Sequence, residues 1–265
     1  MSPSLDPIVS LMQTSPRFDQ QVIAVTGASK GIGRALALEL GRRGAIVILI
    51  ARDLSALESL YDAILEAGGA EPVIVPCDFK TLDANTALEL AELIGGEFGR
   101  LDGLVHMGAI MGGREPIQTH RPDHWANVIQ INLNAVFYLT QALLPLLEQS
   151  TAGRIVMATS SVGYNVQAYW GAYAVSKAGL EMLTGMLAQE LENTSKTRVL
   201  TVNPGGTRTA MRAEAKPGED PTSLPPPELV LDAFLFGLCN EAEAFHGQRI
   251  NARDLMAALQ IWPAS

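Results

Sequence analysis

"VIAVTGASKGIGRALALEL", residues 22–40, reads as a short apolar strand, a glycine-rich turn and a helix in immediate succession. Glycines in such a turn allow a tight reversal, a close approach of the backbone to a pyrophosphate, and close packing of the helix on the strand. The start of the helix adds free amides and a partial positive charge that favour an anion. The stretch therefore predicts a dinucleotide-binding unit, with Gly27, Gly31 and Gly33 as its turn.

The remainder of the chain repeats this alternation of strand and helix. Five further runs are β-branched and apolar on both faces, as in a parallel sheet covered on two sides; they are "AIVILI" (45–50), "PVIVP" (72–76), "GLVHM" (103–107), "RIVMAT" (154–159) and "RVLTVN" (198–203). Amphipathic stretches lie between them at 33–44, 54–69, 124–149 and 177–193. We predict a single-domain α/β protein, a doubly wound parallel sheet (Rossmann fold) with helices on both faces and a ligand crevice beyond the carboxyl ends of the strands.

Within this domain, taken as residues 21–255, one segment fits no period. Residues 208–227, "RTAMRAEAKPGEDPTSLPPP", are rich in proline and charge and fit neither strand nor helix. A long segment of this kind in a compact domain is often functional. We therefore expect a mobile substrate lid at 208–227. Residues 1–20 are predicted as an N-terminal extension and residues 256–265 as a C-terminal tail.

The composition narrows the class of partner. The net charge of the 265 residues is −9 and no run of Lys and Arg exceeds two residues, which disfavours nucleic acid and anionic membranes. Two cysteines, Cys77 and Cys239, are too few for a disulfide framework or a thiolate metal site, and we expect no metal. The longest apolar run, 45–51, is far shorter than the ~20 residues of a membrane helix, and the N-terminus lacks the features of a signal peptide. These observations favour a cytoplasmic protein.

The spacing of the turn is TGxxxGxG rather than GxGxxG, and further short motifs follow it in order. They are "CD" (77–78), "IN" (131–132), "SSVG" (160–163), "YAVSK" (173–177) and "NPGGTRT" (203–209). Over residues 20–210 this set resembles the short-chain dehydrogenase/reductase (SDR) superfamily of the TGxxxGxG and YxxxK type. The run from Trp170 to Ala213 is similar in particular to bacterial oxidoreductases called YciK-like. The resemblance implies an oxidoreductase that reduces a ketone or aldehyde, or oxidises the alcohol.

Two cations indicate which nicotinamide cofactor such an enzyme would use. A ribose diol is held by an acidic residue about 20 positions past the glycine turn, whereas a 2′-phosphate needs cations. Ala51 stands where NAD-specific relatives usually carry Asp; Arg52 follows it, and Lys30 precedes Gly31. A guanidinium fork and an ammonium suit a phosphate, so we predict NADP(H). The alternative is that both are solvated surface charges, and Asp53 complicates the local electrostatics.

The resemblance implies further cofactor contacts. Asp78 would hydrogen-bond the adenine amino group, with an ordinary strand-end turn as its alternative role. A backbone amide near Thr207 would meet the nicotinamide carboxamide, and Thr209 would add a hydroxyl. The full predicted cofactor-binding set is Gly27, Ser29, Lys30, Gly31, Ile32, Gly33, Arg52, Asp78, Phe79, Gly108, Tyr173, Lys177, Pro204, Gly205, Thr207 and Thr209.

Tyr173 and Lys177 form the predicted catalytic pair. Residues four apart share one face of a helix, and an ammonium favours the phenolate, so we expect Lys177 to lower the phenol pKa from its usual ~10. The resemblance implies that Tyr173 protonates the substrate oxygen, Ser160 hydrogen-bonds it, and Lys177 also contacts the ribose. Asn132 would anchor a proton relay at a helix kink. Ser161 and Asn134 are neighbours that the motif spacing leaves out.

Two places depart from the family pattern. "HMGA", 106–109, stands where the family usually reads NNAG, so we expect altered hydrogen bonding at the sheet end, crowding of the ribose by Met107, and a structural His106. The C-terminus keeps Gly247 and Gln248 but lacks the family's terminal glycine pair. That end often shapes the substrate pocket and the interface of the homo-oligomer, a dimer or tetramer, that the resemblance implies.

Two alternative functions remain open. A 3-oxoacyl thioester reductase would need basic residues near the pocket mouth for an acidic carrier, and Arg208 and Arg212 are the candidates. A non-catalytic Rossmann module that senses NADP(H) is the other alternative, although a sensor has no need of the Ser-Tyr-Lys-Asn set.

Overall fold

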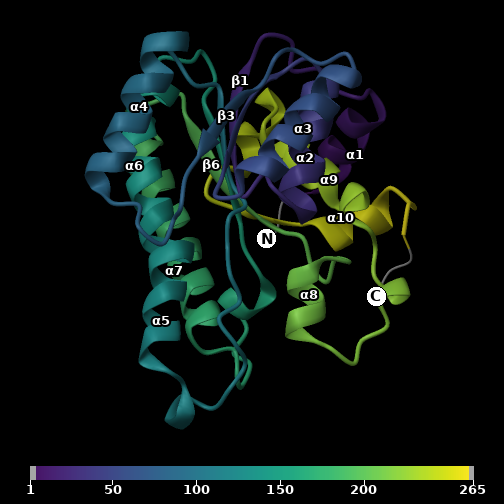
Figure 1. The fold of residues 1–265 in the computed structure, drawn as a ribbon. Helices are drawn as coiled ribbons and strands as arrows, with labels where there is room; N and C mark the ends of the chain where they lie inside the picture. Colours follow the sequence, from purple (N-terminus) through teal and green to yellow (C-terminus); the bar gives the residue numbers. More distant parts are fainter. Residues whose placement is uncertain (1–3, 263–265) are drawn as a thin grey trace.

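Seven parallel strands form one sheet in the order β3-β2-β1-β4-β5-β6-β7, in a computed structural model that describes residues 4–262 (Figure 1). The strands are β1 (Val22–Thr26), β2 (Ile46–Ala51), β3 (Val73–Pro76), β4 (Gly103–His106), β5 (Arg154–Ala158), β6 (Arg198–Asn203) and β7 (Arg249–Asn251). The order reverses between β1 and β4, where Thr26 lies beside His106. A crevice opens at such a reversal in doubly wound sheets. The predicted fold class is confirmed.

Helices cover both faces of the sheet (Figure 1). One face carries α4 (Ala84–Phe98), α6 (Ala135–Glu148) and α7 (Gly171–Leu191); the other carries α2 (Gly31–Arg42), α3 (Leu54–Glu66) and α9 (Leu231–Gly237). Two more, α1 (Asp6–Gln13) and α10 (Ala252–Ala258), pack against α9. Two short helices, α5 (Pro122–Ile129) and α8 (Ala210–Ala215), lie at the end of the molecule to which the strands point. No helix within residues 4–262 has the length and apolar character needed to cross a bilayer.

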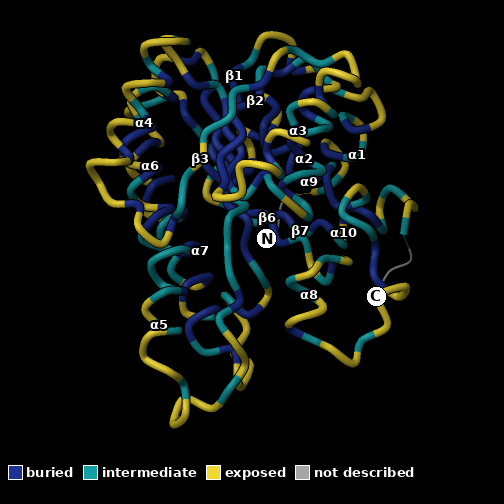
Figure 2. Tube along the Cα trace, in the orientation of Figure 1, coloured by how far each residue is buried: buried dark blue, intermediate teal, exposed yellow. Residues whose placement is uncertain are grey.

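The five inner strands, β2, β1, β4, β5 and β6, read as continuous apolar runs because they are buried on both faces. In β1, Ile23 and Val25 join the cluster under α2 and α9, whereas Val22 and Ala24 join the cluster under α4 and α6. Figure 2 shows the central strands as buried, whereas the edge strand β3 is only partly buried. Two apolar layers therefore hold the strands rigidly, and the loops at their carboxyl ends are fixed in position.

Residues 208–227 contain more regular structure than the sequence suggested. Helix α8 occupies 210–215, and Thr209 caps it by accepting a hydrogen bond from the Arg212 amide (3.2 Å). The Arg212 side chain forms a two-pronged ion pair with Glu219, with Nη2 2.6 Å from Oε1. The prediction that this segment has no helix is wrong, because six helical residues are too few to show a period.

Both predicted terminal segments pack into the domain. Ile8 of α1 is fully buried against α9 and α10, and Phe18 is almost fully buried. The predicted tail begins inside α10. The first three residues of the predicted extension and the last three of the predicted tail lie outside the described residues.

Candidate active site

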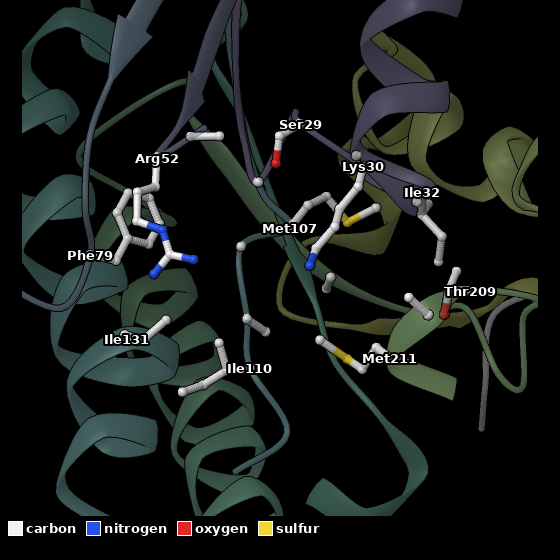
Figure 3. Close-up of a pocket in the computed structure, with 18 of the residues that line it drawn as sticks. Ser29, Lys30, Ile32, Arg52, Phe79, Met107, Ile110, Ile131, Thr209 and Met211 are labelled. Carbon is white, nitrogen blue, oxygen red and sulfur yellow. The ribbon is translucent and has the colours of Figure 1, made fainter. Parts of the chain in front are cut away.

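A cavity of about 350 Å³ lies at the carboxyl ends of the strands (Figure 3). Its wall contains most of the predicted cofactor-binding set, namely Gly27, Ser29, Lys30, Gly31, Ile32, Gly33, Arg52, Asp78, Phe79, Gly108, Tyr173, Lys177, Pro204 and Thr209. Gly205 and Thr207 belong to the same loop as Pro204 but do not line the cavity, and Thr207 is buried. The fold thus gathers segments that are far apart in the sequence around one space.

The start of α2 suits an anion. No side chain caps this helix, whereas Asp53 and Asp83 cap α3 and α4 through hydrogen bonds to backbone amides. The first amides of α2 are therefore available to a ligand. Gly27, at φ +67°, lies against Gly108, and a Cβ added to Gly27 would be 2.7 Å from the Gly108 Cα atom. Glycine at position 27 thus lets the two loops pack together, and the glycine turn and the uncapped start of α2 both line the cavity, so the residues present fit a dinucleotide.

Lys30 and Arg52 stand on opposite sides of the cavity, both exposed. Figure 3 shows their nitrogen atoms turned toward the space between them. The Asp53 carboxylate accepts a hydrogen bond from the Ala56 amide (3.1 Å), so it serves the start of α3. The Asp78 side chain likewise accepts a hydrogen bond from the Lys80 amide (3.0 Å), as expected if it stabilises the turn at the end of the strand. Asp78 also lines the cavity, where it could contact a cofactor.

Tyr173, Lys177 and Ser160 meet at one wall. Tyr173 and Lys177 are buried, on the same face of α7. Lys177 Nζ donates to the Ala158 carbonyl (2.8 Å) and lies 5.7 Å from the centre of the Tyr173 ring. Ser160, two residues after the end of β5, lies close enough to the Tyr173 phenol to lower its pKa, whereas Ser161 is exposed. The structure thus brings together three of the four predicted catalytic residues.

Burial dominates the protonation of this pair. Burial raises the pKa of Tyr173 to about 12, and the nearby Ser160 hydroxyl only partly counters this change. Burial lowers the pKa of Lys177 to about 8, and the charge of Glu181 opposes that change. The expectation of a lowered phenol pKa is wrong for this structure, because the ammonium donates to a backbone carbonyl and not to the phenol. At neutral pH the phenol is protonated and most of the lysine is charged.

Asn132, the fourth predicted catalytic residue, lies behind the wall. It is fully buried in a π-helical turn, Gln130–Asn134, that joins α5 to α6. Its Oδ1 atom accepts from the Ile110 amide and its Nδ2 atom donates to the Ile110 carbonyl, both at 2.9 Å. Asn132 thus pins the loop that follows β4. The neighbouring Asn134 donates only to Gln130, one turn earlier.

The "HMGA" departure has a structural explanation. The amides of Met107 and Gly108 donate to Thr26 Oγ1 (3.0 and 3.1 Å), so the sheet end keeps its hydrogen bonds. His106 is buried, its Nε2 atom is 2.9 Å from Thr140 Oγ1, and burial lowers its pKa to about 3. It is therefore neutral at physiological pH. Met107 lies in the cavity wall (Figure 3).

The wall also contains residues that the sequence did not predict. Ile110, Ile131 and Thr159 line the cavity, and Thr159 Oγ1 is buried with no hydrogen-bond partner. Their only signal in the sequence is adjacency to a strand end or to a motif residue. Across residues 4–262, no three side chains that could ligate a metal come together.

Comparison with known proteins shows sequence and structural similarity over most of this chain. Residues 21–220 match the sequence model of the short chain dehydrogenase family. The uncharacterized oxidoreductase YciK of Escherichia coli K12 is 40% identical over 245 residues, which cover 91% of this chain and 96% of YciK. The 3-oxoacyl-[acyl-carrier-protein] reductase FabG of Thermotoga maritima is 33% identical, with 88% and 96% covered. The crystal structure of a short chain dehydrogenase from E. coli CFT073 in complex with NADPH is 40% identical and superimposes with a TM-score of 0.86, covering 89% of this chain and 97% of that one.

Proposed function

The chain belongs to the short chain dehydrogenase family of oxidoreductases, and from this premise we propose that it reduces a ketone or aldehyde with NADPH, or carries out the reverse oxidation of an alcohol. One observation carries the proposal: a protonated, buried Tyr173 lies beside Lys177 and near Ser160, in the wall of a cavity that also contains the uncapped start of α2.

NADP(H) is the cofactor predicted from the sequence, and a solved relative that holds NADPH supports this assignment. The first amides of α2 would hold its pyrophosphate, and Lys30 and Arg52 would hold its 2′-phosphate. When bound, the cofactor supplies or accepts the hydride.

The chain's own residues would manage the proton. In the reductive direction, the Tyr173 hydroxyl donates its proton to the substrate oxygen as negative charge develops there. Ser160 donates a hydrogen bond to the same oxygen and so stabilises that charge. Lys177, charged below about pH 8, stabilises the phenolate that remains and contacts the ribose. Asn132 keeps the opposite loop in place and anchors the water through which the proton is replaced.

A panel of ketones and aldehydes assayed by NADPH absorbance tests this function. Tyr173→Phe should lower turnover at least a hundredfold, as expected for loss of a general acid, and should leave the Kd for NADPH within threefold. Lys177→Ala should impair both. Ser160→Ala should lower turnover, whereas the adjacent control Ser161→Ala should not. If Tyr173→Phe kept more than a tenth of the activity on every substrate, the mechanism would be wrong.

The two alternatives give different outcomes in the same assay. A 3-oxoacyl thioester reductase would prefer acetoacetyl thioesters over all free ketones, and similarity to FabG favours it. Of the two arginines predicted to meet an acidic carrier, however, Arg212 is paired with Glu219 and only Arg208 is left. An NADP(H) sensor would bind NADPH and turn over nothing.

The proposal also covers the substrate's size, the cellular location and the oligomeric state of the enzyme. Its substrate is a small molecule, since the acidic chain offers no nucleic-acid surface by composition. We place it in the cytoplasm, because its cysteines, Cys77 and Cys239, are both free. We also propose that it works as a homo-oligomer, a dimer or tetramer.

A further inference from the structure

A third apolar cluster stands apart from the two layers that hold the sheet. It consists of Met111, Val162, Trp170, Tyr173 and Ala215, with Ala174 and Met211 packed against it. These residues come from the loop after β4, the turn after β5, the start of α7, and α8. Because Tyr173 is a member, the cluster adjoins the position of the reacting carbonyl. Met211 also reaches into the main cavity (Figure 3). A substituent on the carbonyl carbon would therefore meet an apolar wall.

One polar group in this wall has no partner. Trp170 is 5% exposed, its ring lies 5.8 Å from that of Tyr173, and its Nε1–H is buried with no hydrogen-bond acceptor. A buried donor without an acceptor is costly, and such groups in a native protein call for an explanation. An acceptor that arrives with the substrate would supply the missing hydrogen bond.

A cation lies directly over the same ring. The Arg114 guanidinium is 4.8 Å from the centre of the Trp170 ring, and its Nη1 atom donates to the Ala215 carbonyl at the end of α8 (2.7 Å). No carboxylate of the described residues lies within 4 Å of it. The adjacent Glu115 instead has its Oε1 atom 3.5 Å from His120 Nδ1. Arg114 is exposed and has no counter-ion among the described residues, so its remaining donors are accessible to a ligand.

The Trp170 indole, whose N–H has no acceptor within residues 4–262, thus contacts both the Arg114 guanidinium and the Tyr173 ring. A carboxylate matches the indole N–H and the guanidinium, because it accepts several hydrogen bonds and pairs with the planar fork of Arg. We propose that the substrate is an apolar oxo acid. Its hydrocarbon part packs on Met111, Val162 and Met211, and its carboxylate binds Arg114 and Trp170. This inference rests on the proposed carbonyl reduction and adds the class of carbonyl compound.

The test compares three matched compounds: an eight-carbon oxo acid, its methyl ester and octanone, with the keto group moved along the chain. The ester keeps the acceptors but loses the charge. We expect kcat/KM with NADPH to be at least tenfold higher for the best acid than for its ester, mainly through KM. Arg114→Gln should bring this ratio to about one, and Arg114→Lys should restore part of it. Trp170→Phe should lower kcat/KM for acid and ester relative to octanone.

Two matched substitutions serve as controls. Arg121→Gln removes a guanidinium that is paired with Asp123, and Trp125→Phe removes an indole N–H outside the cluster. Both should leave the acid-to-ester ratio unchanged. The inference is overturned if the acid is no better than the ester in the wild-type protein. It is also overturned if Arg114→Gln lowers all three compounds equally, as a purely structural clamp on α8 would.

Binding separates this inference from the proposed function. The Tyr173→Phe protein, saturated with NADPH, should bind the oxo acid at least tenfold more tightly than the ester in calorimetry, and the further change Arg114→Gln should remove the difference. If no carbonyl compound is reduced by the wild-type protein but this preference holds, the proposed reaction fails and the acid site stands. If acid and ester bind equally, the acid site fails whatever the enzyme reduces.

Discussion

Burial shifts the pKa values of Tyr173 and Lys177 in opposite directions, and these shifts decide which form of each side chain takes part in the reaction. Removal from water disfavours the charged form of each side chain. The Tyr173 phenol therefore keeps its proton up to about pH 12, while the Lys177 ammonium loses its proton near pH 8. A protonated phenol is the form that can act as an acid in carbonyl reduction. The four-residue spacing predicted the pair, but not its pKa values. Those depend on how distant segments such as the end of β5 cover α7.

The cofactor preference can be tested at Arg52. We expect the wild-type protein to bind NADPH at least tenfold more tightly than NADH, about 1.4 kcal/mol. Arg52→Asp should reduce this ratio below three or invert it, because a cation is lost and a carboxylate joins Asp53. Fluorescence titration with both dinucleotides measures the two Kd values. Lys196→Asp, at an exposed site outside the cavity wall, should leave the ratio unchanged; equal affinities in the wild-type protein would contradict the assignment.

His106 should make the protein sensitive to acid. Its pKa in the folded state, about 3, lies below the ordinary value of 6.5, so the unfolded chain binds more protons and stability falls as pH drops below 6.5. From pH 7.5 to 5.0 this single group should cost about 2 kcal/mol of unfolding free energy. His106→Gln should lose about that much less over the same interval in urea denaturation.

Subtracting the unfolding free energy of the His106→Gln protein from that of the wild-type protein removes the contribution of all other titrating groups. Between pH 8.5 and 7.5, where His106 is neutral in both states, the two free energies should change in parallel. An equal loss in both proteins between pH 7.5 and 5.0 would show that His106 is not kept neutral by burial.

At the scale of elements, the strands were the most predictable part. All six predicted strands agree with the structure to within one residue at each end. Five of them are buried on both faces, which leaves a continuous apolar run, and the edge strand β3 is partly buried but still apolar. Strand β7 was not predicted, because three residues are too few to give a recognisable apolar run. The stretch 124–149 reads as one helix, but the π turn around Asn132 divides it into α5 and α6. Periodicity does not reveal one inserted residue, so only the motif pointed to Asn132.

Helix α8 has few contacts with the rest of the site. They are the hydrogen bond from Arg114 to the Ala215 carbonyl and the apolar contacts of Ala215 and Met211, whereas the bond from the Arg208 amide to the Pro225 carbonyl lies within the segment 208–227 itself. Lids that exclude water from a reaction are drawn from such weakly held segments. We therefore predict that residues 208–227 exchange their amide hydrogens rapidly alone and slow at least tenfold once cofactor and substrate bind.

Hydrogen exchange with mass spectrometry on the free protein, on the NADPH complex and on a ternary complex measures this. The buried strand β5 is the internal control, and its exchange should stay slow in all three states. Unchanged exchange across 208–227, while the glycine turn became protected, would show that the segment is a fixed part of the wall.

At the scale of the molecule, one outer surface is unusually apolar. Val175, Met182 and Met186 are 48%, 67% and 52% exposed on α7, and spacings of seven and four residues put them on one side of that helix. Phe137, on the adjacent α6, is 42% exposed. We name these four residues the α7 patch. The sequence could not single them out, because their spacing also suits a buried face, and only the packing of α7 on the sheet shows which side faces outward.

The α7 patch supports the proposed homo-oligomer. Contiguous apolar surface on a folded domain commonly marks a contact with another chain, and a twofold contact would place the patch of one copy against that of another. We predict that sedimentation equilibrium gives a mass of at least twice 28.3 kDa.

The double change Met182→Glu and Met186→Glu would bring like charges together at the centre of the contact. It should weaken association at least a hundredfold, about 2.8 kcal/mol. Leu93→Glu, at a position on α4 that is 73% exposed, is the matched control and should leave the mass unchanged. A wild-type mass of one chain at micromolar concentration would refute the oligomer, and an unchanged assembly in the double variant would show that a different surface forms it.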